Sequence, residues 1–91
     1  MEIDYNSFLK IGNMEIIDIR DENEYKKKHL SNAINIPFQR LIVYPNQYLK
    51  KDKKYLLVCE LGLKSKKTCE ILNRNGYQVY SLKNGIKGIS L

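Results

Sequence analysis

Short apolar runs alternate with amphipathic stretches along the whole chain. Four runs rich in β-branched or aromatic residues predict strands, at residues 14–19, 33–36, 55–59 and 78–82. The segments between and before them predict helices, at residues 5–11, 22–30, 38–50 with an interruption at Pro45, and 65–76. Because parallel strands need long crossover connections, this alternation predicts an α/β fold with a mostly parallel sheet and helices on both faces.

The size of the chain limits it to one core. With 91 residues, 43% of them hydrophobic, we expect a single domain over residues 1–91. No apolar run approaches the roughly 20 residues of a membrane span, and the start MEIDYNSF lacks the layout of a signal peptide. We therefore expect a cytoplasmic protein without membrane contacts, and a monomer.

The positive charge comes almost entirely from lysine. The net charge of +6 rests on 13 lysines against three arginines, with clusters at KKKH, KKDKK and KSKK. Proteins that bind nucleic acids favour arginine and interleave aromatic residues with basic ones, and this chain does neither. We expect no nucleic-acid partner and interpret the lysines as solvated surface. Attraction of anionic substrates or acidic partners is the alternative.

The chain contains two cysteines, Cys59 and Cys69, and one histidine, His29. No further cysteine or histidine completes a zinc site, and a single cysteine pair does not indicate a disulfide scaffold. We expect two free thiols, since the cytosol keeps thiols reduced, and no metal. Cys69 falls about one turn into an expected helix, where burial is the preferred interpretation and a resolving thiol is the alternative.

Reactive and charged residues stand where predicted strands end. Cys59 closes one strand, and Asp18 and Arg20 close another. The carboxyl ends of parallel strands gather at one edge of a sheet, where ligand sites form. We therefore expect a candidate site that includes Cys59.

The segment after Cys59 has the features of an anion-binding loop. The next helix is expected to begin near Ser65 as its N-cap, with Ile71 and Leu72 toward the core. Gly62 allows the loop to curl so that its N–H groups point inward and stabilise a thiolate, the reactive form of a cysteine. A buried cysteine without chemistry is the alternative interpretation.

Three segments, in order along the chain, carry recognisable motifs: IIDIRDENEYKKKHLSNAINIPF (16–38), CELGLKS (59–65) and GYQVYSLKNGIKGI (76–89). They resemble the Asp-x-Arg strand end, the active-site loop and the last strand with its glycine turn in the rhodanese-like sulfurtransferases. The resemblance implies a small α/β domain that takes a sulfane sulfur onto its cysteine as a persulfide and passes it to a nucleophilic acceptor. It implies no metal and no organic cofactor.

Carried over residue by residue, the resemblance makes Cys59 the nucleophile that accepts the sulfur. The loop amides that hold the persulfide fall on Glu60, Leu61, Gly62, Leu63 and Lys64, and the closing cap falls on Ser65. Lys64 stands where a basic residue meets an anionic donor such as thiosulfate, although lysine lacks the bidentate fork of arginine. Glu60 would oppose a thiolate if it pointed inward, so we expect it to face solvent.

The resemblance also suggests supporting roles. Asp18 and Arg20 are expected to brace the neighbouring loops, with a surface ion pair of small value as the alternative. The histidine of this turn is usually structural in the family. His29 is therefore expected to be a hydrogen-bonded support, and a base that activates Cys59 is the less favoured alternative.

Two turns depart from the family pattern. Ser31 and Asn32 stand where a Pro-Gly pair is common, and Asn84 and Gly85 stand where a Gly-Gly turn is common. Asparagine tolerates the left-handed conformation, so both turns are expected to persist. The chain has no tryptophan and ends at Leu91, so we expect a short or weakly packed last helix.

The leading hypothesis is a rhodanese-type sulfurtransferase that takes sulfur from thiosulfate or a small persulfide and passes it to cyanide, a thiol or a protein. One alternative is a cysteine phosphatase or arsenate reductase of related fold, although those loops are typically one residue longer and end in arginine. Another is a non-catalytic module of the same fold that binds a partner or senses redox state through Cys59.

Overall fold

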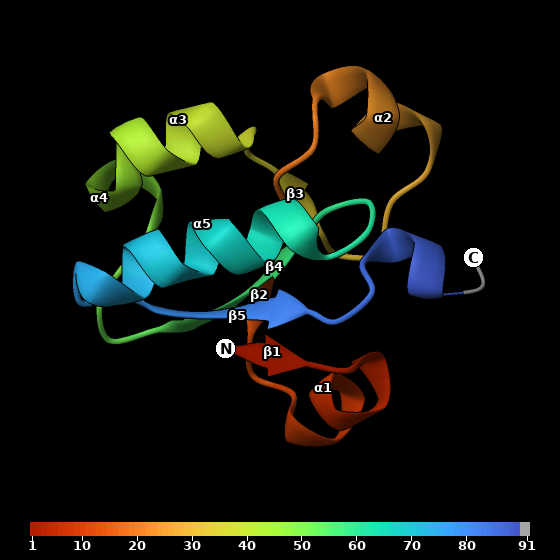
Figure 1. Cartoon of the computed structure of the whole chain (residues 1–91), viewed down its shortest axis with the longest axis horizontal. Helices are drawn as coiled ribbons and strands as arrows, with labels where there is room; N and C mark the ends of the chain where they lie inside the picture. Colours follow the sequence, from red (N-terminus) through yellow and green to blue (C-terminus); the bar gives the residue numbers. More distant parts are fainter. Residues whose placement is uncertain (90–91) are drawn as a thin grey trace.

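In the computed structural model, which describes residues 1–89, the central strand β4 (Lys54–Val58) is buried on both faces from Tyr55 onward, as its uninterrupted apolar run requires. Four strands accompany it: β1 (Glu2–Ile3), β2 (Glu15–Asp18), β3 (Ile34–Asn35) and β5 (Gln78–Leu82). Their order is β1-β5-β4-β2-β3, and every neighbouring pair is parallel (Figure 1). The predicted α/β class with a parallel sheet is confirmed.

Helices cover both faces of the sheet. They are α1 (Tyr5–Ile11), α2 (Glu22–Lys27), α3 (Phe38–Val43), α4 (Pro45–Tyr48), α5 (Leu63–Arg74) and the 3₁₀ helix η1 (Ile86–Gly88). One core lies under α3, α4 and α5, where Leu41 and Leu72 pack with Leu57 of β4. The other lies under α1 and η1, where Phe8 and Ile86 pack on that side of the sheet. Alternate residues of β4 therefore serve opposite cores.

Local sequence signals explain most helix boundaries. Asp4 and Asp21 cap α1 and α2 by accepting hydrogen bonds from backbone N–H groups of the first turn. Pro45 begins α4 and divides the predicted helix at 38–50 into α3 and α4. The predicted helix at 22–30 ends earlier, at Lys27, and the short edge strand β1 was not predicted.

Two features of α5 differ from the sequence-based prediction: the residue at which the helix begins and the exposure of Ile71. The helix begins at Leu63, and its N-cap is Gly62 in the left-handed conformation, so the prediction that Ser65 caps it is wrong. Ser65 lies inside the first turn and is fully buried. Leu72 is in the core as predicted, whereas Ile71 is 39% exposed, because a helix turns adjacent residues about 100° apart.

The two asparagine turns persist in the predicted way. Asn32 and Asn84 both have positive φ angles, at 68° and 65°. The last helix described, η1, has only three residues, which agrees with the expected short helix, and its Ile86 is buried in the second core. Ser90 and Leu91, with which the expected last helix would end, lie outside the described residues.

Candidate active site

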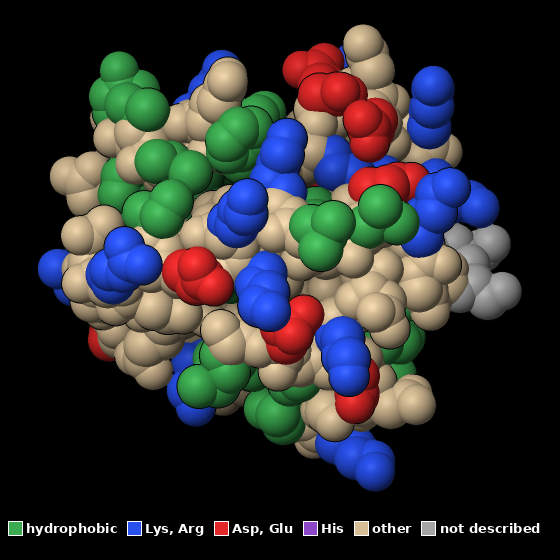
Figure 2. Space-filling model, viewed as in Figure 1, with side chains coloured by type: hydrophobic (Ala, Val, Ile, Leu, Met, Phe, Trp, Pro, Cys, Tyr) green, Lys and Arg blue, Asp and Glu red, His purple; other side chains and the backbone are tan. Residues whose placement is uncertain are grey.

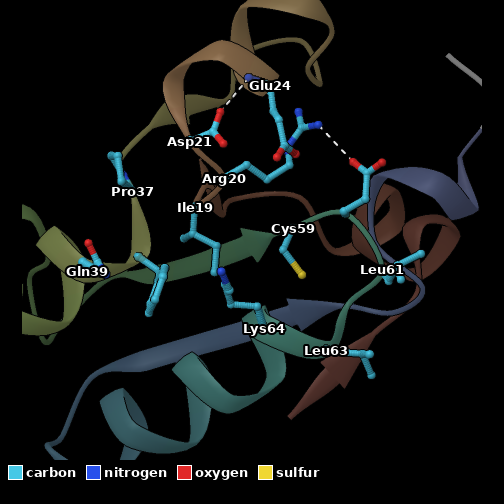
Figure 3. A pocket seen from close by; sticks show the side chains of 12 residues that line it. Ile19, Arg20, Asp21, Glu24, Pro37, Gln39, Cys59, Leu61, Leu63 and Lys64 are labelled. Atoms are coloured by element: carbon cyan, nitrogen blue, oxygen red, sulfur yellow. Dashed lines mark hydrogen bonds and ion pairs between the residues drawn. The ribbon is translucent and has the colours of Figure 1, made fainter.

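Cys59 lies at the carboxyl edge of the sheet, directly after β4. Cys59 is 4% exposed and borders a cavity of about 400 Å³ (Figure 3). The cavity is lined by the end of β2, the start of α3 and the loop from Cys59 to Lys64. The end of β4 therefore places the thiol at the carboxyl edge of the sheet, where the sequence predicts a site.

The Cys59 sulfur sits inside a curled loop that supplies hydrogen-bond donors. The backbone N–H of Gly62 donates to Sγ at 3.2 Å, and that of Ser65 donates at 3.3 Å. The Ser65 hydroxyl lies 3.3 Å from the same sulfur. Gly62 permits the curl, because its φ of +90° lies in the region that favours glycine. Such donors stabilise negative charge on the sulfur.

The remaining loop residues surround the sulfur without donating to it. Among residues 1–89, the N–H groups of Glu60, Leu61, Leu63 and Lys64 make no hydrogen bond to Sγ itself. The structure therefore places Glu60, Leu61, Leu63 and Lys64 along the cavity, whereas the amides that point at the sulfur belong to the buried Gly62 and Ser65.

A buried serine pair supports the loop from below. Ser65 Oγ lies 2.6 Å from Ser81 Oγ of β5, and both side chains are fully buried. The carbonyl oxygen of Gly62 accepts from both hydroxyls, at 3.3 and 3.5 Å. Sequence reasoning missed Ser81, although a serine within the apolar run QVYSL is a signal that a buried polar partner is present.

The turn after β5 holds the cysteine loop from behind. The N–H of Ile86 donates to the Cys59 carbonyl at 2.9 Å, and the N–H of Lys87 donates to the Glu60 carbonyl at 3.0 Å. These two bonds require the backbone of Gly85 to approach the loop closely. A Cβ atom at Gly85 would lie 2.5 Å from the Cys59 carbonyl oxygen.

Arg20 links the ends of two strands. Its side chain donates to the fully buried carboxylate of Asp18, with Nη2 2.8 Å from Oδ2, and Nη2 also donates to the Lys28 carbonyl. Nη1 binds the Glu60 carboxylate at 3.2 Å, the ion pair drawn from Arg20 in Figure 3. The hydrogen bonds to Asp18 raise the pKa of Arg20, which burial opposes.

Glu60 was expected to face solvent, and it does so only in part. Its side chain is 42% exposed, but the carboxylate is paired with Arg20, whose side chain is only 8% exposed. The pairing offsets part of the negative charge that stands next to the thiol. Arg20 connects Asp18 at the end of β2 with Glu60 of the cysteine loop, and the bracing role of Asp18 and Arg20 stays a prediction.

The other candidate residues lie outside this sulfur-binding geometry. Among residues 1–89, His29 does not line the cavity; its ring stacks on Tyr25 at 3.8 Å and its Nδ1 lies 2.7 Å from the Tyr25 carbonyl oxygen. Cys69 is fully buried, as predicted, and desolvation raises the pKa of its thiol to about 12. Both cysteines are free thiols.

No metal or membrane feature accompanies the site in the part of the chain that the structure describes. Residues 1–89 contain no group of three His, Cys, Asp or Glu side chains that could hold a metal ion. Within the same residues, no helix has both the length and the apolar character needed to cross a bilayer.

The sequence and the fold of this chain both have counterparts among known proteins. The sequence model of the rhodanese-like domain matches residues 4–91. The chain belongs to the rhodanese-like family. A rhodanese-related protein from Thermoplasma volcanium has a solved structure with a TM-score of 0.85 and 27% sequence identity, covering 96% of this chain and 87% of that one.

Rhodanese-like relatives differ in their described activities. The thiosulfate sulfurtransferase GlpE of Coxiella burnetii is 30% identical over 80 residues, which cover 87% of this chain and 74% of GlpE. A tRNA uridine(34) hydroxylase of Buchnera aphidicola is 32% identical over 89 residues, which cover 91% of this chain and 28% of the hydroxylase. The chain spans only 28% to 58% of the length of some curated relatives, so their activities belong to longer proteins.

Proposed function

We propose that this protein is a sulfurtransferase that takes a sulfane sulfur onto Cys59 as a persulfide and transfers it to a nucleophilic acceptor. One observation carries the proposal: the Cys59 sulfur borders an open cavity while the N–H groups of Gly62 and Ser65 point at it. A cysteine with only a packing role needs neither the cavity nor the donors.

The reaction divides into two displacements at sulfur. The Cys59 thiolate attacks the outer sulfur of thiosulfate, a new sulfur–sulfur bond forms, and sulfite leaves with the electron pair of the bond that breaks. An acceptor such as cyanide then attacks the outer sulfur of the persulfide. Thiocyanate leaves, and the electron pair of the broken bond regenerates the Cys59 thiolate. The N–H groups of Gly62 and Ser65, which point at the Cys59 sulfur, stabilise the negative charge on it in both steps.

Two charged side chains tune the cavity for an anionic donor. Lys64 is exposed at the cavity edge, with its ammonium 4.2 Å from the centre of the Phe38 ring. It provides positive charge without the bidentate geometry of arginine, so a small persulfide is as suitable a donor as thiosulfate. Arg20 keeps the Glu60 carboxylate paired, which limits its repulsion of an incoming anion.

The remaining expectations belong to the same proposal. Donors are thiosulfate or a low-molecular-weight persulfide, and acceptors are thiols or proteins. We place the protein in the cytoplasm, because a reducing compartment keeps its two free thiols available. It acts as a monomer and needs neither nucleic acid nor membrane.

Intact mass spectrometry tests the proposal. The purified protein is measured before and after thiosulfate, and again after cyanide, with Cys59→Ser and Cys69→Ser beside it. We expect the wild type and Cys69→Ser to gain one sulfur atom that cyanide removes, and Cys59→Ser to gain none. Absence of the adduct on a folded wild type would contradict the proposal. Hydrolysis of an aryl phosphate by the same sample would favour the phosphatase alternative.

A further inference from the structure

Apolar side chains continue from the Cys59 cavity onto the surface. A second cavity of about 390 Å³ shares Phe38, Leu63 and Lys64 with the first, and it extends between α3 and α5 to Ile42 and Ile71. We call the strip lined by Phe38, Ile42, Leu63 and Ile71 the apolar groove. Figure 2 shows hydrophobic side chains gathered over α3 and beside α5, with lysine and arginine side chains between them.

The core accounts for only part of this strip, since of its four side chains Phe38 packs against the first core. Leu63 is 69% exposed at the first position of α5, and Ile71 is 39% exposed two turns later. On the other side of Gly62, Leu61 is 55% exposed at the edge of the Cys59 cavity. A contiguous apolar strip beside a reactive group is typical of a binding surface, whereas single exposed apolar residues are ordinary.

Positive charge borders the apolar groove. Lys64 and Lys67 both line it, and neither has an acidic side chain within ion-pair distance in residues 1–89. The whole chain carries a net charge of +6. This charge opposes pairing of the groove with a second copy of the chain and attracts an acidic partner.

The recessed position of the Cys59 thiol favours a polypeptide partner over a membrane surface or a small anion. Cys59 is only 4% exposed and lies in a recess, which a flat membrane surface cannot enter. A small anion such as thiosulfate fits in the recess and buries no apolar surface of the strip that runs along α5. A polypeptide segment can fill the strip with apolar side chains while one of its own side chains enters the recess.

We propose that the apolar groove docks a protein segment that is acidic and apolar and that presents a cysteine to the Cys59 persulfide. This rests on the proposed function and specifies its acceptor. The partner's thiolate attacks the outer sulfur of the persulfide and forms a new sulfur–sulfur bond. The bond between that sulfur and Cys59 breaks, and its electron pair returns to Cys59 as the thiolate, so no oxidant or reductant is consumed.

Synthetic peptides with one cysteine each test the acceptor chemistry. One peptide surrounds the cysteine with leucine and glutamate, a second with leucine and lysine, and a third with serine and glutamate. The full chain is loaded with sulfur from thiosulfate and freed of excess donor, and transfer to each peptide is followed by mass. We expect the leucine–glutamate peptide to react about tenfold faster than either of the others, because only it matches both features of the groove.

A double variant, Lys67→Glu with Ile71→Ser, tests the surface itself. Both residues are exposed and outside the sulfur-binding loop. The matched control, Lys54→Glu with Leu9→Ser, replaces an exposed lysine at the start of β4 and an exposed aliphatic residue on α1, neither of which lines the groove. We expect the rate with the leucine–glutamate peptide, divided by the rate with cyanide, to fall about tenfold in the groove variant and to stay within twofold in the control.

Failure of this inference is separable from failure of the proposed function. If cyanide discharges the persulfide but the three peptides react equally, or the groove variant matches the control, the docking inference is overturned. Two further measurements on the groove variant are binding to vesicles that contain phosphatidylserine and sedimentation of the protein alone. The docking inference is also overturned if the variant keeps its rate with the leucine–glutamate peptide and loses only vesicle binding or only a dimer. If no persulfide forms on Cys59, the proposed function itself fails.

Discussion

The hydroxyl oxygens of Ser65 and Ser81 lie 2.6 Å apart, fully buried, next to the Cys59 thiol. The two serine hydroxyls each have one proton to donate, and the acceptors within reach are the other hydroxyl, the Gly62 carbonyl oxygen and, for Ser65, the Cys59 sulfur. When the sulfur is a thiolate, Ser65 can donate to it while Ser81 donates to Ser65. When the sulfur is a thiol, its proton can point to Ser65 instead. The pair thus adapts its donors to the charge on Cys59.

Replacing Ser81 by alanine should therefore slow the reactions of Cys59. The hydroxyl of Ser65 would lose the donor that supports it, and a net hydrogen bond of this kind contributes about 1 kcal/mol. We expect the rate of alkylation by iodoacetamide at pH 7 to fall roughly threefold to tenfold. Thr68→Val is the control, because it removes another buried hydroxyl of the same region that bonds only within α5. Equal rates in the two variants would refute a role for Ser81.

Gly85→Ala should displace the cysteine loop. An added Cβ would collide with the carbonyl oxygens of Cys59 and Glu60. Gly12→Ala is a close control, because Gly12 has nearly the same φ and ψ, 60° and −166° against 63° and −164°, but no atom within 4 Å of the added Cβ. Both variants carry backbone strain of about 1–3 kcal/mol.

Only Gly85→Ala should add the collision, so we expect it to lower the free energy of unfolding by about 1–3 kcal/mol more than Gly12→Ala does. Chemical denaturation measures both. We also expect the alkylation rate of Cys59 to change in Gly85→Ala alone, and an unchanged rate would contradict the proposed support of the loop.

Arg20→Lys should destabilise the junction between β2 and the cysteine loop. Lysine cannot contact the Asp18 carboxylate, the Lys28 carbonyl and the Glu60 carboxylate at the same time, as the guanidinium does. Loss of charge-assisted hydrogen bonds should lower the free energy of unfolding by about 2 kcal/mol. In Arg40→Lys, at an exposed position without an ion pair in residues 1–89, the change should stay below about 0.5 kcal/mol. Similar effects of the two substitutions would rule out the bracing role.

The buried Cys69 should make stability fall at high pH. Desolvation raises the pKa of its thiol from 9.0 to about 12, so between those pH values the unfolded chain holds fewer protons than the folded one. The favourable contribution is complete below pH 9 and is lost as the pH rises toward 12, with a slope of about 1.4 kcal/mol per pH unit at most.

The variant Cys69→Ala should show a shallower decline of the unfolding free energy between pH 9 and 11, because the other titrating groups are common to both proteins. A parallel decline in the two proteins would show that Cys69 does not contribute. Under native conditions at pH 8, an excess of iodoacetamide should alkylate Cys59 and leave Cys69 unmodified.

The sequence by itself determined the class of fold and the location of Cys59 at the end of a strand. The apolar runs at 55–59 and 78–82 are short and rich in residues typical of strands, and the amphipathic segment between them can form the crossover helix that parallel strands need. These are local properties of consecutive residues. The same is true of the left-handed turns at Asn32 and Asn84, which asparagine favours through its own backbone preferences.

Only the tertiary structure decided which groups meet at the sulfur. Ser81 and Gly85 come from the far end of the chain, and their approach to Cys59 depends on the pairing of β4 with β5. The partner of Glu60 is Arg20, 40 positions earlier, which no local pattern indicates. The helix start at Leu63 also differs from the expectation, since the left-handed Gly62 is the N-cap and Ser65, inside the first turn, donates its N–H to the Cys59 sulfur. Contacts between distant segments depend on packing of the whole sheet, whereas helix and strand preferences depend on neighbours in sequence.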